Sequence, residues 1–414
     1  MLTQTTSEGG FSHVLINKTF SDFSLDKHEK AFISRLYLGT LEKMIFLDFI
    51  INSYSSVSTQ KMKGVIKNIL RMGAYQILFM DNVPDHAAIN ESVKLANKKG
   101  FSNLKGFVNG VLRTIQREKI PEDIPENVKY CVPKRFYELC INRFGIDEAR
   151  SFFENINQTS EYIWARLNMQ SSSKEEIIKL LEEDGCEVIE NEEIDEAVQI
   201  RGFSSLTDLS AYKKGLIFIQ DFSSMNIAHY ARVLTKNKDV RLILDVCAAP
   251  GGKSTHMAAK FPDAFVYARD LSKNKTDLID ENIKRLKLKN IQSQIFDATI
   301  NDNMMAQKAD IVLADLPCSG LGIIGHKPDI KLRVKEKDLK ELASLQRKIL
   351  GVVYQYVKND GMLIYSTCTI NEEENEKNTR WFLDNYPFEL VKEMNFLPGR
   401  DNCDGFYIAF MKRK

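Results

Sequence analysis

The sequence predicts a multidomain protein: an all-α front, a small α+β middle domain, and an α/β domain built on a doubly wound parallel sheet. The first observation is the length of 414 residues, which suggests two or three domains. The second is helical spacing of apolar residues in the front. The third is a series of short apolar strands that alternate with helical segments in the last part. We place the domains at residues 1–145, 146–225 and 226–414.

The composition is that of a globular protein, with 43% apolar and 27% charged residues. No apolar run approaches the roughly 18 residues that span a membrane. The start, MLTQTTSEGGF, lacks the pattern of a signal peptide. The seven cysteines form no CxxC pair and no metal-ligand spacing with histidine. We therefore expect a cytoplasmic protein with reduced thiols, no metal site and no membrane partner.

The net charge of +1 conceals two charged regions. Residues 1–145 hold 20 Lys and Arg against 14 Asp and Glu, whereas residues 175–196 hold 11 acids and one lysine. We interpret the acidic run as a solvated face, and the basic front favours contact with nucleic acid.

Local patterns support each domain. Apolar residues recur at three- and four-residue spacing over 30–47 and 66–78, which predicts a helical bundle. In the middle, residues 161–168 resemble a strand, and 172–181 form an amphipathic helix with a serine cap. Residues 186–189 follow as the next strand.

The last part predicts a parallel sheet from the apolar strands 242–245, 264–268, 311–315 and 361–366. Ligands of such sheets bind at the carboxyl ends of the strands. Asp245 and Asp315, which close the first and third of these strands, therefore stand where chemistry is expected.

The stretch DVCAAPGGKST at residues 245–255 raises the question of a phosphate-binding loop. A Walker loop needs a glycine five residues before Gly252, and that position is Cys247. The G-x-G-x-x-G fingerprint is absent too. What remains is a strand, a turn of small residues, and a helix whose first N–H groups can face a polar ligand. An ATPase is therefore the weakest interpretation.

Two further acids follow the next strands. Asp270 can accept both hydroxyls of a ribose, and Asp297 could reach an adenine edge. A glycine turn followed by a ribose-binding acid is the arrangement of a sheet that binds S-adenosylmethionine. The alternative is an ordinary turn with surface acids.

Two cysteines, Cys318 and Cys368, also follow strands at this edge. A thiolate that adds to C6 of cytosine turns the ring into an enamine, so that C5 can attack a methyl sulfonium. A hydrogen-bond partner at N3 is needed as well, and Asp315 suits that role if its pKa is raised enough for it to donate. The sequence pattern alone does not decide which of the two cysteines is the nucleophile.

The segments DVCAAPGGKST, DLPCSGLG (315–322) with KPDI (327–330), and STCTINEEENE (366–376) resemble the RsmB (Sun/Fmu) family. These are bacterial 16S rRNA cytosine-5 methyltransferases of the NOL1/NOP2/Sun group. The stretches 31–55, 70–100 and 106–115 are similar to the NusB-like RNA-binding domain of that family, and 215–224 is similar to the lead into its catalytic domain. The likeness covers nearly the whole chain.

The resemblance implies a class I methyltransferase fold of the Rossmann-like type and a role for each matching position. Cys368 is implied as the nucleophile, and Cys318 as the group that assists product release. The residues implied to bind S-adenosylmethionine are Cys247, Ala248, Ala249, Pro250, Gly251, Gly252, Lys253, Asp270, Asp297 and Asp315. Gly325 stands where the family usually has arginine, which affects the expected RNA contacts.

A basic patch supplies the candidate RNA-binding residues: Lys94, Lys98, Lys99, Lys105, Arg113, Arg117 and Lys119. Residues 94–119 contain a single acid, so the patch could follow phosphates; the alternative is a solvated helix face. The target base must be unstacked to reach a thiol, which favours a loop or exposed rRNA.

The leading hypothesis is a monomeric enzyme that methylates C5 of a cytosine in 16S rRNA, either free or in an assembling small subunit. A tRNA cytosine-5 methyltransferase is an alternative with the same chemistry. A NusB-like RNA-binding assembly factor with an inactive methyltransferase domain is an alternative from another class. The sequence does not identify the cytosine.

Overall fold

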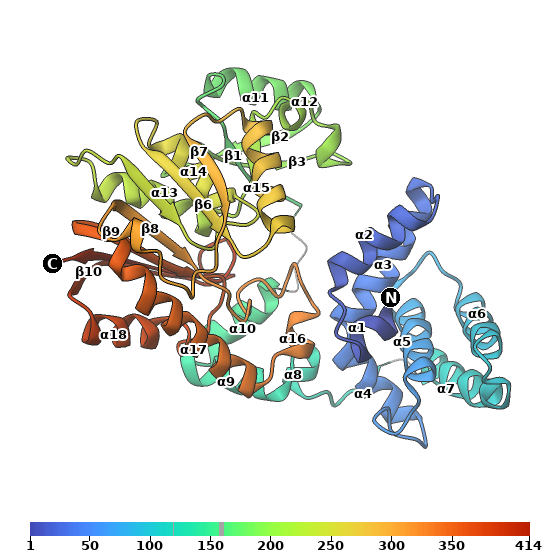
Figure 1. Ribbon diagram of the computed structural model, residues 1–414. Helices are drawn as coiled ribbons and strands as arrows, with labels where there is room; N and C mark the ends of the chain where they lie inside the picture. The colour runs from blue at the N-terminus through green and yellow to red at the C-terminus, as the bar shows by residue number, and fades with distance from the viewer. Residues whose placement is uncertain (119, 157–160) are drawn as a thin grey trace. The chain divides into compact units, whose positions relative to one another are not determined.

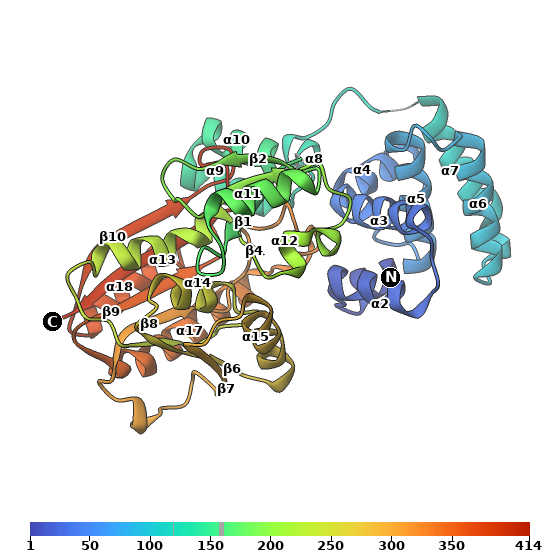
Figure 2. The same ribbon diagram turned by 90° about the horizontal axis from the view of Figure 1, so that it is seen from above.

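The computed structural model describes residues 1–118, 120–156 and 161–414, so Lys119 of the basic patch lies outside the described residues. Close contacts divide the chain into two compact units (Figures 1 and 2). The first contains Met1–Asn157 and Ile324–Val334, and the second contains Gln158–Ile323 and Lys335–Lys414. The three-domain division at residues 145 and 225 stays a prediction.

The first unit confirms the predicted helical bundle. The helices between residues 44 and 118 pack apolar faces around one core, in which Leu47, Ile50 and Leu112 are fully buried. Arg71 is buried beside this core and binds both carboxylate oxygens of Asp48, at 2.7 and 2.6 Å. The helices are α1 (Leu2–Ser7), α2 (Ser12–Asp22), α3 (Lys27–Glu42), α4 (Met44–Tyr54), α5 (Gly64–Phe79), α6 (Asp85–Lys98), η1 (Ser102–Leu104), α7 (Lys105–Glu118), α8 (Glu126–Lys129), α9 (Lys134–Phe144) and α10 (Ile146–Ile156).

A late segment of the chain, Ile324–Val334, completes this helical unit. It contains the short helix α16 (Ile330–Arg333). The hydroxyl of Ser12 donates a hydrogen bond to the buried carboxylate of Asp329, and Leu332 packs against the cluster around Tyr37 and Leu41. The segment leaves the second unit after residue 323 and returns to it at residue 335.

The second unit begins with a small antiparallel sheet of strand order β2-β3-β1-β4. Ser173 starts its main helix with a capping box, as the serine cap predicted. The elements are β1 (Ile163–Leu167), α11 (Lys174–Glu183), β2 (Glu187–Glu190), β3 (Ala197–Arg201), η2 (Leu206–Asp208), α12 (Ser210–Lys213) and β4 (Ile217–Ile219).

The larger sheet of this unit has the order β10-β11-β9-β8-β5-β6-β7. The strands from β9 to β7 in this order are parallel, which confirms the predicted doubly wound sheet, and β10 and β11 add an antiparallel edge that the sequence did not reveal. Its strands are β5 (Leu242–Asp245), β6 (Phe265–Asp270), β7 (Ile291–Ile295), β8 (Ala309–Asp315), β9 (Val357–Thr367), β10 (Phe388–Phe396) and β11 (Phe406–Arg413).

Helices cover both faces of this sheet (Figure 1). Ile243 faces a core made with α13, α14 and α15, whereas the next residue, Leu244, faces a core made with α17 and α18. The strands are therefore apolar on both sides, as in other parallel sheets. The helices are α13 (Phe222–Leu234), α14 (Gly252–Lys260), α15 (Lys273–Leu286), η3 (Asn303–Met305), α17 (Glu336–Val353), η4 (Tyr354–Tyr356) and α18 (Glu376–Asn385).

In the part of the chain that the structure describes, no helix combines the length and apolar character that crossing a membrane requires. Within the same residues, no three His, Cys, Asp or Glu side chains are grouped to hold a metal ion.

Candidate active site

The candidate site lies at the carboxyl edge of the larger sheet, where the strand order changes direction. After β5 the chain builds β6 and β7 on one side, and then crosses over to place β8 on the other side of β5. Asp245 is paired in register with Ala268 of β6 and with Leu313 of β8. Asp245 and Asp315 therefore flank the switch point of the sheet, where open α/β folds bind ligands.

The turn after β5 is held by its own strand. Asp245 accepts a hydrogen bond from the hydroxyl of Ser254 at 2.5 Å and one from the N–H of Cys247 at 3.3 Å. Gly251 has φ +102°, a left-handed conformation that favours glycine, and it caps α14. The turn thus presents backbone N–H groups at a helix N-terminus, as expected for a polar ligand.

Burial changes the protonation of Asp245. Its carboxyl is buried under the turn, and this desolvation raises its pKa to about 7, with Asp315 adding to the effect and the Ser254 hydrogen bond opposing it. Asp245 is therefore a structural carboxyl beneath the turn.

Asp270 and Asp297 lie at and just after the next two strand ends. Asp270 is buried and accepts the N–H groups of Ala249 at 2.9 Å and Leu271 at 2.7 Å. Asp297 accepts both the N–H and the hydroxyl of Thr299 at 2.8 Å, which lowers its pKa. Two carboxylates at one edge suit a ligand with hydroxyl and amine donors.

Lys253 and Asp315 form an ion pair of 2.6 Å across the switch point. Burial alone would lower the pKa of Lys253, but the Asp315 carboxylate raises it above its usual value. The other carboxylate oxygen of Asp315 accepts the Ser366 hydroxyl at 2.8 Å. Both oxygens of Asp315 are therefore engaged, one by the half-buried ammonium group of Lys253 and one by the Ser366 hydroxyl. The role of Asp315 as the hydrogen-bond partner at N3 stays a prediction.

The structure brings Cys318 and Cys368 together, with their Sγ atoms 3.2 Å apart and neither cysteine in a disulfide. The hydrogen bond to Cys368, burial, and the nearby Glu374 and Asp315 raise the pKa of Cys318 well above its usual value. Lys253 interacts electrostatically with Cys368. The two thiols are thus unequal, because Cys318 has acids beside it and Cys368 has a cation.

A buried network that the sequence did not predict fixes the loops of the two cysteines. Glu374 accepts hydrogen bonds from the N–H of Ser319 at 2.9 Å, and from the amides of Gln346 and Asn371, both at 3.0 Å. Glu374 belongs to an acidic run, which favours a solvated face, so only its neighbours Asn371 and Asn375 hinted at an internal role.

Asn375 holds the residues on either side of Cys368. Its side chain accepts the hydroxyl of Thr367 at 2.5 Å and donates to the carbonyl of Thr369 at 2.9 Å. Asn375 itself is buried. Asn375 therefore ties together the two residues that flank Cys368.

The candidate RNA-binding residues lie in the helical unit, on α6, just after it, and on α7. Lys94 pairs with Glu91, and Arg117 pairs with Glu118, both at 2.7 Å. Lys105 is half-buried, whereas the exposed members are Lys94, Lys98, Lys99, Arg113 and Arg117. Most of the patch is therefore exposed, and two of its cations, Lys94 and Arg117, are already in ion pairs with neighbouring glutamates.

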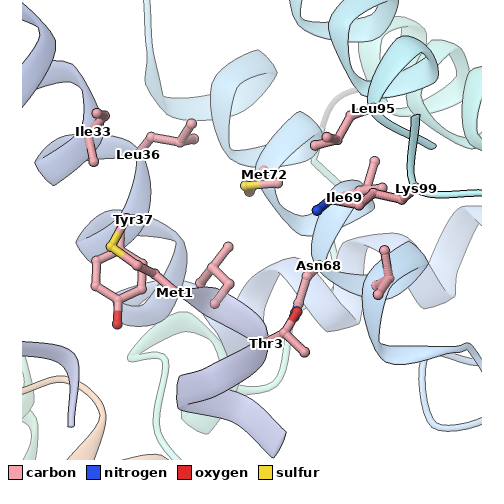
Figure 3. Close-up of a pocket in the computed structure, with 12 residues that line it drawn as sticks. Met1, Thr3, Ile33, Leu36, Tyr37, Asn68, Ile69, Met72, Leu95 and Lys99 are labelled. Atoms are coloured by element: carbon pink, nitrogen blue, oxygen red, sulfur yellow. The ribbon is translucent and has the colours of Figure 1, made fainter. Parts of the chain in front are cut away.

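The helical unit also contains a cavity of about 330 Å³ (Figure 3). Its lining is largely apolar, with Leu36, Met72 and Leu95 among the contributors, and Asn68 and Lys99 supply polar groups. No cysteine or carboxylate lines it, so it offers no group for the chemistry at the sheet edge.

Gly325, where the resemblance leads one to expect arginine, approaches the end of α10. A Cβ atom at this position would lie 2.8 Å from the carbonyl oxygen of Ile156. Any side chain here would require the backbone to move, so the departure from the family pattern matches a close backbone contact.

Comparisons with known proteins agree with this architecture. A family model described as 16S rRNA methyltransferase RsmB/F matches residues 231–412, and the NusB family model matches residues 2–117. The probable ribosomal RNA small subunit methyltransferase B of Bacillus subtilis (strain 168) is 31% identical, covering 98% of this chain and 95% of its own. The ribosomal RNA small subunit methyltransferase B of Cronobacter sakazakii is also 31% identical, covering 93% and 91%.

Two solved structures share the fold. PH0851 has a TM-score of 0.83 at 26% identity, covering 100% of this chain and 97% of its own. NSun6 from Pyrococcus horikoshii, solved with SFG, has a TM-score of 0.60 at 23% identity, covering 68% of this chain and 98% of its own.

The burial of Asp245 predicts a pH-dependent effect on stability. The pKa of Asp245 is about 7 in the folded protein and near 4 in the unfolded chain. Between pH 4 and pH 7 this carboxyl must therefore take up a proton when the chain folds. This cost grows as the pH rises and levels off above about 7. Asp245→Asn mimics the protonated acid and removes the cost. The stability of the variant relative to the parent should therefore rise by about 3 kcal/mol from pH 5 to pH 8, measured by denaturant unfolding.

The matched control is Asp297→Asn. The pKa of Asp297 is lowered, so both its folded and unfolded values lie below pH 5. Its effect on stability should therefore be the same at the two pH values. Equal pH dependence of the Asp245→Asn variant and the parent would contradict the assignment of Asp245 as a buried acid.

Proposed function

Because the chain belongs to the RsmB/F family of 16S rRNA methyltransferases, we propose that it transfers a methyl group from S-adenosylmethionine to C5 of a cytosine in 16S rRNA. We propose that the reaction passes through a covalent bond between Cys368 and C6 of the base. The observation that carries this proposal is the pair of cysteine Sγ atoms 3.2 Å apart, near the half-buried ion pair of Lys253 and Asp315.

The cofactor site in this proposal is the turn Cys247–Lys253 with Asp270, Asp297 and Asp315. The hydroxyls of a ribose suit the buried carboxylate of Asp270, and the open backbone of the turn suits a polar ligand. When bound, S-adenosylmethionine supplies an electrophilic methyl group.

Cys368 is the proposed nucleophile. A thiolate is the reactive form of cysteine, and a neighbouring cation favours it. Lys253 provides that charge, whereas the hydrogen bond with Cys368, burial and the nearby acids raise the pKa of Cys318 well above its usual value. This asymmetry supports the ranking that the family resemblance implies and that the sequence pattern alone left open.

The remaining residues handle protons. Addition of the Cys368 sulfur to C6 places negative charge on the ring, and the Lys253–Asp315 pair would offer a hydrogen-bond partner at N3. After C5 has accepted the methyl group, a base takes the C5 proton. The electron pair of the C5–H bond then forms the C5–C6 double bond, and the C6–S bond breaks to return the Cys368 thiolate. We assign Cys318 to this release step, since it lies against the Cys368 sulfur.

The test of the proposed function is to incubate the protein with methyl-labelled S-adenosylmethionine and unmodified 16S rRNA, small-subunit particles or tRNA, and then identify the labelled nucleoside. We expect label in 5-methylcytidine from 16S rRNA or the particle. Label in tRNA alone would favour the alternative substrate. Binding of the donor without label in any RNA would favour an inactive RNA-binding factor.

Variants of the two cysteines should fail in different ways. Cys368→Ala should lose methylation by at least about 10³-fold and form no adduct, because the nucleophile is gone. Cys318→Ala should retain a protein–RNA band on a denaturing gel, because release is impaired.

The double variant should lose that band, and Cys186→Ala, which changes a buried cysteine of the small sheet, should methylate normally. An adduct that survives Cys368→Ala would reverse the assignment of the two residues.

The basic patch should bind RNA through phosphates. Replacing Lys98, Lys99 and Arg113 with Gln should weaken RNA binding and reduce the slope of log K against log salt by up to about 2, or about 0.7 per lost contact. Fluorescence anisotropy at several salt concentrations measures both.

The matched control replaces three exposed lysines of the other unit with Gln: Lys273, Lys337 and Lys340. An equal change of slope in both triple variants would mean that the patch has no special part in RNA binding.

A further inference from the structure

Two buried polar residues lie on strand β1 of the small sheet and directly after its end, and they point the same way. Arg166 and Asn168 are two positions apart, so their side chains leave the same face of the chain. Both are at most 5% exposed. A buried guanidinium is costly unless its donors find acceptors, so the position of those acceptors indicates what the residue does.

The acceptors of Arg166 lie at the start of α14. One terminal nitrogen donates to the carbonyl oxygen of Gly252 at 2.9 Å, and the other donates to the hydroxyl of Thr255 at 3.0 Å. The first nitrogen also donates to the side chain of Gln220 at 2.9 Å, and the guanidinium lies 5.2 Å from the ring centre of Phe218. Arg166 therefore joins the small sheet to the first turn of α14.

Asn168 makes the corresponding connection to α15. Its amide donates to the carbonyl of Leu286, the last residue of that helix, at 3.0 Å, and to the carbonyl of Gly215 at 2.9 Å. Nearby, a Cβ atom at Gly215 would lie 1.8 Å from the carbonyl oxygen of Arg285, so the two backbones are in direct contact. The small sheet is thus held against both helices.

These helices are the ones that position the proposed cofactor residues. α14 begins at Gly252, directly after the turn, and α15 begins three residues after Asp270. Phe218 packs against Gly252 so closely that a Cβ atom there would lie 3.0 Å from the ring. Asn282 of α15 donates to the carbonyl of Pro250 at 3.0 Å. The turn is therefore fixed from the α15 side and from the small sheet.

We propose that Arg166 is a positioning residue that sets the affinity for S-adenosylmethionine by fixing Gly252 and the turn before it through its fork of hydrogen bonds. The small sheet then acts as a support for the cofactor site. This inference rests on the proposed cofactor site, and it extends that site to a residue outside the turn and strand ends.

Replacing Arg166 with lysine separates the effect of its two hydrogen bonds from the effect of its charge. Arginine can reach the Gly252 carbonyl and the Thr255 hydroxyl together, whereas the single ammonium group of lysine cannot span both in the same way. Arg166→Lys should therefore weaken cofactor binding less than Arg166→Gln but not restore it. Thr255→Val removes one acceptor and leaves the arginine in place, so it should weaken binding by a smaller factor.

The test measures S-adenosylmethionine binding to the full chain by isothermal titration calorimetry. We expect Arg166→Gln to raise the dissociation constant about tenfold, as the loss of charge-assisted hydrogen bonds suggests. At saturating cofactor, kcat should stay within about twofold, and the KM for the cofactor should rise with the dissociation constant. A change confined to the dissociation constant and the KM for the cofactor would indicate a positioning role. A general structural defect would instead lower kcat and the folded fraction together.

Arg201→Gln is the matched control. Arg201 lies on the neighbouring strand β3, is paired with Glu187 at 2.5 Å on the outside of the same sheet, and should leave cofactor binding unchanged. Unchanged binding in both Arg166→Lys and Thr255→Val would overturn the proposal, even if Arg166→Gln fails to fold. If the parent protein itself does not bind S-adenosylmethionine, the proposed cofactor site fails instead.

Discussion

The ion pair between Lys253 and Asp315 is the contact on which the rest of the site depends. It joins the helix after the turn to the end of β8, so two segments that approach the switch point from opposite sides are fixed to each other. The half-buried ammonium group of Lys253 would lose the carboxylate that offsets its desolvation if this pair were broken. Ser366 extends the pair to β9, two residues before Cys368. The carboxylate of Asp315 thus contacts both the turn proposed to bind the cofactor and the strand that leads to Cys368.

Much of this edge was predictable, because it follows from periodicity and topology. Short apolar strands alternating with helices predict a parallel sheet, and a parallel sheet gathers its strand ends at one edge. Asp245, Asp315, Cys318 and Cys368 follow strands, so their proximity was expected from position alone. The antiparallel strands β10 and β11 at the other edge of the sheet were not predicted.

The unpredicted residues share one property: each is a polar side chain whose partner is set by tertiary packing. Glu374 belongs to an acidic run, and local pattern treats such a run as solvated, yet its carboxylate binds three internal donors. Arg166 interrupts an apolar strand without any motif of its own. The contact between Asp315 and the ammonium group of Lys253 was not foreseeable from their spacing. Sequence spacing places residues along strands, but it does not choose hydrogen-bond partners.

The segment Ile324–Val334 has a consequence for how the protein is made. The helices of the first unit leave the ribosome early, but the residues that complete that unit are encoded more than 160 positions later. Until Asp329 and Leu332 have been synthesised, Ser12 and the cluster around Tyr37 lack their final neighbours. The early helices must therefore persist in an incomplete state during translation, and an amino-terminal fragment that ends before residue 324 would never reach the packing of the intact chain.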